Sequence, residues 1–138
     1  MALMGRPVPY TDVMVILMGA PHESDQTTSV LRLVQAMLER GGRVQVWTCG
    51  HATHLTRQAL GAAKQRNIAS WTTTYPTTAT LVQDMLAAFP DQLYWYGCQF
   101  CSEDRGVHDH VPEVVLRRPS TFAANSAATG KTLMVGVM

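Results

Sequence analysis

The chain has 138 residues, of which 46% are hydrophobic and 15% are charged, and its formal net charge is +1. This composition excludes a disordered polypeptide, and the length suits one domain around a single core. The lysines and arginines form no clustered basic stripe, so nucleic acid is not an expected direct partner. The longest apolar run, Val13 to Ala20, is much shorter than the ~20 residues of a membrane span, so no membrane association is expected.

The start of the chain is rich in Gly and Pro. We expect residues 1–11 to form a flexible leader and residues 12–138 to form a single α/β domain. Only Arg6 supplies positive charge before the apolar run, and Pro21 stands close to where a cleavage site needs small residues. A signal peptide is therefore not favoured. Three cysteines without such a signal predict thiols in a cytoplasmic protein, not a disulfide framework.

Strand and helix patterns alternate along the chain. Continuous β-branched runs are typical of strands covered on both faces, and apolar residues at helical spacing indicate the helices. Ser24 or Asp25 is placed to cap the first long helix, and Thr80 with Gln83 has the spacing of a capping box for the second. The predicted order is strand 13–18, helix 24–40, strand 44–47, short helix 51–60, helix 80–89, strand 93–96, helix from about 101, strand 114–116, weak helix 120–128 and strand 133–137.

This alternation predicts a three-layer α/β sandwich around a mostly parallel sheet of about five strands. In such sheets ligands gather beyond the carboxyl ends of the strands. Three loops are expected there: Gly19 to Asp25, Cys49 to His54, and Gly97 to His110. Any chemistry should be built from these loops. The irregular stretch from Gly61 to Thr78 is expected to form a lid or an oligomer contact.

The strongest chemical signal is the pair Cys98 and Cys101 with C-x-x-C spacing. Cys98 follows a predicted strand and precedes a predicted helix, and a helix N-terminus stabilises a thiolate. We therefore predict that the pKa of Cys98 falls below that of a free thiol. Arg105, about one turn beyond Cys101, adds positive charge. His22 and Cys49 follow the first two strands and are expected near this pocket together with Gly97.

The C-x-x-C spacing by itself permits dithiol redox chemistry, zinc binding or transport of sulfur as a persulfide. Gln99-Phe100 is an unusual filling for a thioredoxin-like motif. Structural zinc needs four ligands, and no second pair with finger spacing exists, so no metal is predicted. The residues that in principle complete a zinc set are Cys49, His51, His108 and His110, the last two in a loop expected to be exposed. A phosphate-binding loop at Thr129 to Thr132 is rejected, because a strand follows where a helix should.

Several segments together resemble the DsrE/DsrF/TusD family of small sulfur-relay proteins. The most specific is Cys98 to Gly106, which has the family's C-x-x-C-x-x-x-R-G pattern. The others are the turn Met18 to Pro21, the helix Leu31 to Leu38, the strand entry Gly41 to Val44, the strand end Trp47 to His51 and the final strand Gly130 to Val137. The resemblance covers the chain from about residue 12, although Gln99-Phe100 replaces the small residues usual inside the motif.

The resemblance implies a function and a set of partners. It makes Cys98 the persulfide carrier, eight residues before Gly106, with Cys101 as a second cysteine that resolves the persulfide and Arg105 as a helper. It implies sulfur donor and acceptor proteins as partners, a trimer or hexamer, and no cofactor. Two alternatives stay open: an oligomeric module that binds a small ligand or metal without catalysis, and a dithiol–disulfide oxidoreductase that uses Cys98 and Cys101.

Overall fold

The computed structural model describes residues 7–64 and 69–136 of the chain. Its five strands form one sheet in the order β4-β3-β2-β1-β5, and every neighbouring pair is parallel. The predicted parallel sheet of about five strands is therefore confirmed. The strands are β1 (Thr11–Leu17), β2 (Val44–Thr48), β3 (Leu93–Cys98), β4 (Val115–Arg117) and β5 (Thr129–Val135).

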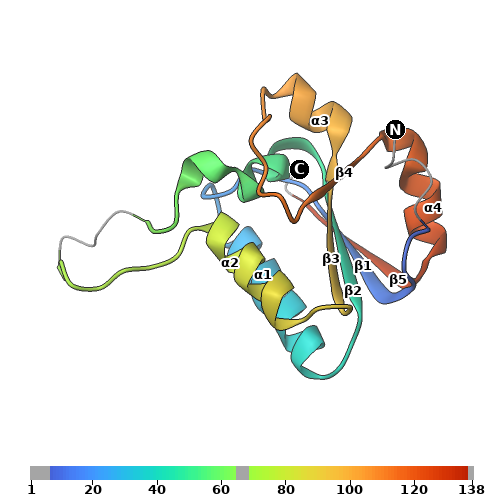
Figure 1. Ribbon diagram of the computed structural model, residues 1–138, viewed down its shortest axis with the longest axis horizontal. Coiled ribbons are helices and arrows are strands. Elements are labelled where there is room, and N and C mark those ends of the chain that lie inside the picture. Colours follow the sequence, from blue (N-terminus) through green and yellow to red (C-terminus); the bar gives the residue numbers. More distant parts are fainter. Residues whose placement is uncertain (1–6, 65–68, 137–138) are drawn as a thin grey trace.

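Helices lie on both sides of this sheet, as expected for a three-layer sandwich. Figure 1 shows α1 and α2 side by side on one face and α4 on the other, with α3 beyond the end of β3. The α-helices are α1 (Gln26–Glu39), α2 (Thr78–Ala88), α3 (Gln99–Asp104) and α4 (Phe122–Ala127). Short 3-10 helices are η1 (Gly50–Thr56), η2 (Gln58–Leu60) and η3 (Pro119–Thr121).

The core has two parts because successive side chains of a strand point to opposite faces of the sheet. Val15 and Leu17 of β1 pack in the part that α1 and α2 cover. Met14 and Ile16 pack in the other part, where Phe122 of α4 contributes from outside. Covering both faces explains why the strands read as continuous apolar runs and not as alternating patterns.

One polar cluster lies inside this core. Gln45, fully buried in β2, donates from Nε2 to Thr11 Oγ1 and to the Asn125 backbone oxygen, each at 3.1 Å. Asn125 Nδ2 donates back to Gln45 Oε1 at 3.0 Å. These bonds satisfy most of the polar atoms that burial takes from water. They tie the start of α4 and β1 to the centre of the sheet.

Several predicted boundaries need correction. The capping-box prediction for α2 is wrong, because the cap is Thr77, whose Oγ1 accepts from the Thr80 N–H at 3.3 Å. Helix α3 begins at Gln99, earlier than predicted, since β3 runs without a loop into Cys98. Strand β5 begins at Thr129, because pairing with β1 recruits polar residues with no strand pattern of their own. Such pairing is a tertiary effect that overrides local propensity.

The ends of the predicted segments also shift. Of the two cap candidates for α1, Ser24 makes the bond, its Oγ accepting from the Gln26 N–H at 3.3 Å. The predicted leader lies partly outside the described residues, and its last residue, Thr11, already belongs to β1. Residues 65–68 of the irregular stretch also lie outside them. Within the described residues, no helix combines the length and apolarity that crossing a membrane requires.

Candidate functional site

The register of the sheet places two cysteines side by side. Trp47 pairs with Tyr96 and Thr48 with Gly97, so Cys49 and Cys98 come next at the carboxyl ends of adjacent strands. Cys49 and Cys98 also share the α4 side of the sheet with Trp47 and Tyr96, because side chains two residues apart point the same way. The sequence-predicted position of Cys98 at a strand end is therefore confirmed, and Cys49 is its neighbour.

The first turn of α3 then brings the third cysteine over these two. The Sγ atoms of Cys49, Cys98 and Cys101 all lie within 4.8 Å of one another. The closest contact joins Cys49 Sγ and Cys101 Sγ at 3.6 Å, across 52 residues of sequence. The site is thus a three-thiol cluster from three elements, and not the isolated C-x-x-C pair that the sequence indicates.

The predicted fall in the pKa of Cys98 is wrong. Cys98 is only 2% exposed, and this burial raises the pKa of its thiol to about 12. The backbone amide of Cys101 acts in the opposite direction but does not compensate. A favourable position at a helix start therefore loses to desolvation, which penalises the charged form of any acid. Cys98 is a protonated thiol at neutral pH.

Cys101 is the cysteine whose pKa is lowered. Burial alone raises the pKa of this half-buried thiol, but the backbone N–H of Gly50 more than offsets that effect together with several other groups. The thiols of Cys98 and Cys49 hydrogen-bond to its sulfur, and the charge of Arg105 also favours the thiolate. The negative charge of the cluster is therefore concentrated on Cys101.

Cys49 completes the division of roles. Burial and the hydrogen bond and negative charge of the neighbouring Cys101 raise the pKa of the Cys49 thiol. Cys49 is nevertheless only partly buried and stands in van der Waals contact with the Cys101 sulfur. The cluster thus holds one favoured thiolate and two thiols that donate toward it, the order that desolvation and charge repulsion dictate.

Arg105 lies where the sequence predicts a helper. Its Nη1 donates to the Cys101 backbone oxygen at 3.4 Å and approaches Asp104 Oδ2 at the same distance. Its Nε is buried and has no hydrogen-bond partner among the described residues. The guanidinium therefore supplies positive charge beside Cys101 and keeps one donor available.

Gly97 has a different place from the one predicted. It lies inside β3, where an added Cβ would meet Leu116 Cδ2 at 3.0 Å and Val114 Cγ1 at 3.5 Å. The space that a side chain would take is already filled by these neighbours. This position favours a packing role between β3 and β4 over contact with a substrate.

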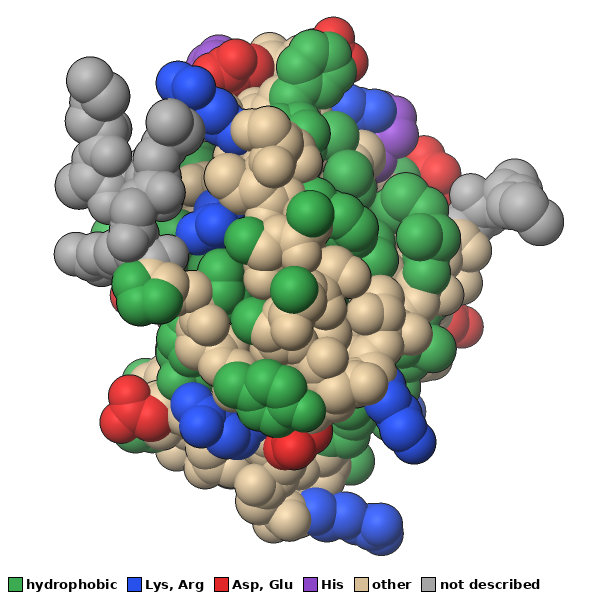
Figure 2. Space-filling model, turned by 90° about the vertical axis from the view of Figure 1, so that its right-hand side faces the viewer, with side chains coloured by type: hydrophobic (Ala, Val, Ile, Leu, Met, Phe, Trp, Pro, Cys, Tyr) green, Lys and Arg blue, Asp and Glu red, His purple; other side chains and the backbone are tan. Residues whose placement is uncertain are grey.

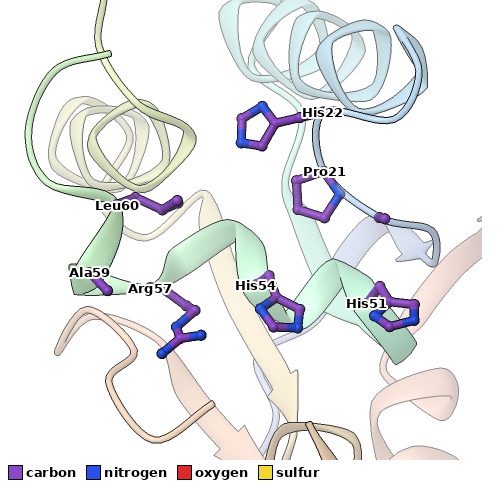
Figure 3. A pocket seen from close by; sticks show the side chains of 8 residues that line it. Pro21, His22, His51, His54, Arg57, Ala59 and Leu60 are labelled. Carbon is purple, nitrogen blue, oxygen red and sulfur yellow. The ribbon is translucent and has the colours of Figure 1, made fainter. Parts of the chain in front are cut away.

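His22 lines a cavity that is separate from the thiols. The cavity has a volume of about 380 Å³, and none of the three cysteines lines it. In Figure 3 the loop after β1 carries His22 above η1, which bears His51 and His54. The loops from β1 and β2 thus meet as predicted, but His22 faces imidazoles and not sulfur. The lining residues are Ala20, Pro21, His22, His51, His54, Arg57, Ala59 and Leu60.

His110 is the site residue that sequence reasoning missed, since it was expected in an exposed loop. Ser102 Oγ donates to the Cys98 backbone oxygen at 2.9 Å, so it accepts from His110 Nε2 at 2.9 Å. His110 Nδ1 then accepts from Thr56 Oγ1, also at 2.9 Å. This chain assigns the neutral Nε2–H tautomer and ties η1 to the turn that carries the cysteines.

The comparisons with known proteins concern the fold. No family model matches the chain, and no curated protein matches its sequence. Among solved structures, the ychN protein from E. coli is similar with a TM-score of 0.72 and 17% sequence identity. The match covers 91% of this chain and 99% of that one. The neighbour has the DsrE-like fold, so this chain has an α/β fold of that type, which confirms the structural part of the resemblance.

Proposed function

We propose that this protein is a sulfur-relay protein that carries sulfur as a cysteine persulfide and passes it to an acceptor. The observation that supports the proposal is the three-thiol cluster at the carboxyl ends of β2 and β3, with a lowered pKa on one member. Sulfur transfer needs a thiolate at neutral pH, and a second thiol beside it provides a release route.

In this proposal Cys101, and not Cys98, is the sulfur carrier. The Cys101 thiolate attacks the outer sulfur of a donor persulfide, R–S–SH. The donor S–S bond breaks, R–S⁻ leaves, and a new S–S bond gives Cys101–S–SH. Arg105 supports this step, because its charge lowers the pKa of Cys101 and its buried Nε is free to donate to a charged terminal sulfur.

Cys49 is then the resolving cysteine when no acceptor arrives. Its thiol gives up a proton and attacks the inner sulfur of the Cys101 persulfide. The terminal sulfur leaves with that proton as HS⁻, and a Cys49–Cys101 disulfide forms. The 3.6 Å contact between the two sulfur atoms supports this pairing, whereas the protonated, buried Cys98 is a poorer nucleophile.

Incubation with a persulfide donor tests the proposal. We expect the wild-type peptide that contains Cys101 to gain one sulfur atom, measured by mass spectrometry after alkylation. With time, a Cys49–Cys101 disulfide should replace it. The Cys49→Ser variant should keep the persulfide several-fold longer, because its resolving thiol is gone. Absence of any added sulfur on the three cysteines would contradict sulfur transfer.

We also propose that the protein self-associates through the side of the molecule that carries β5. This edge strand exposes 40% of Leu133 and 63% of Met134, and Figure 2 shows hydrophobic side chains gathered on that side. Contiguous exposed apolar groups mark interaction surfaces. Met134→Lys should reduce the mass measured by sedimentation, whereas Leu33→Lys, at an exposed position on α1, should not. Equal masses for both variants would contradict this interface.

A further inference from the structure

The three sulfur atoms of the cluster have the spacing of ligands around a single ion. Metal–sulfur bonds of about 2.3 Å in a trigonal plane place the sulfurs about 4.0 Å apart. The Sγ atoms of Cys49, Cys98 and Cys101 lie within 4.8 Å of one another, and the closest two are 3.6 Å apart. An ion between them therefore needs shifts of only a few tenths of an ångström in each side chain.

The donor set selects the kind of ion. In the described part of the chain, no histidine or carboxylate joins the cluster, so the ligands are sulfur alone. Thiolates favour soft cations over Mg²⁺ or Ca²⁺. Cys98 closes the inner side of the site, while the partly exposed Cys49 and Cys101 leave the outer side open for entry and for a water molecule.

The charge of the site selects the valence. Three bound thiolates and a divalent cation carry a net charge of −1. Arg105, whose guanidinium contacts the Cys101 backbone, balances that charge. A monovalent ion leaves an uncompensated negative charge beside a buried residue, which is costly in a low-dielectric environment. The balance therefore favours a divalent ion.

We propose that Cys49, Cys98 and Cys101 form a three-thiolate site for a soft divalent cation of the Zn²⁺ and Cd²⁺ class. The inference does not rest on the proposed sulfur relay, but the two states exclude each other, since both use Cys101. An occupied metal site thus blocks sulfur uptake.

Titration of the reduced protein with Cd²⁺ tests the site. We expect one ion per chain and an ultraviolet thiolate-to-cadmium charge-transfer band with the intensity of three sulfur ligands. In weak buffer, binding should release about two protons, because Cys49 and Cys98 start as thiols. A band with the intensity of two ligands, or no stoichiometric binding, would overturn the proposal even if every variant failed to fold.

Variants separate this site from the simple C-x-x-C alternative. Cys49→Ser should weaken Cd²⁺ binding about 100-fold, measured by competition with a chelator. His51→Ala removes the nearest rival ligand in sequence and should leave the affinity unchanged. If Cys49→Ser binds like the wild type, the site consists of Cys98 and Cys101 only and the inference fails. Persulfide uptake by metal-free protein, scored separately, bears on the sulfur relay alone.

Discussion

Cys101→Ser should lower the rate of sulfur uptake from a persulfide donor by about 100-fold or more, because it removes the one thiol with a lowered pKa. The thiol that remains on Cys98 has a pKa of about 12, so at neutral pH only roughly one molecule in 100,000 holds it as a thiolate. The measurement is the time course of persulfide formation, followed by mass spectrometry.

Cys98→Ser is the matched control, since it makes the same chemical change three residues earlier. It should retain sulfur uptake within about threefold of the wild type, because its main effect is on packing and hydrogen bonding around Cys101. Circular dichroism establishes that both variants are folded. If instead Cys98→Ser abolishes uptake and Cys101→Ser retains it, the family-based choice of Cys98 as the carrier is correct and our assignment is wrong.

The second large effect concerns the stability of the site in acid. Burial, followed by the charges of Arg57 and His54, lowers the pKa of His110 below its ordinary value of 6.5, although Asp109 acts to raise it. As the pH falls, the unfolded chain therefore takes up this proton before the folded protein does. The free energy of unfolding should decrease progressively as the pH falls through 6.5. Urea denaturation between about pH 7.5 and 5.5 measures this change.

His110→Gln separates the histidine from other acid effects. Glutamine keeps one donor and one acceptor but has no proton to gain in this range. The variant should lose stability at neutral pH, yet its unfolding free energy should depend less on pH than that of the wild type. Burial and the charge of Arg57 also lower the pKa of His54, so His54→Gln should flatten part of the profile and the double variant more. Parallel profiles for wild type and His110→Gln would rule out this role.

These expectations change how the motif is understood. The C-x-x-C spacing made Cys98 and Cys101 a pair, but the shortest sulfur contact joins Cys101 to Cys49. The spacing also made the helix start decisive for the thiol pKa, but desolvation of Cys98 is the larger effect. A motif therefore located the chemistry correctly without ranking the residues that carry it.

The sequence by itself determined the order of strands and helices, the parallel sheet and the placement of Cys98 where β3 meets α3. Those features follow from local patterns: continuous apolar runs, helical spacing and the junction between them. Only the tertiary structure decided that Cys49 and His110 belong to the site, that His22 and Gly97 stand apart from the thiols, and that Cys101 holds the charge. The physical reason is that register, burial and charge join residues distant in the chain, and local patterns carry no record of those distances.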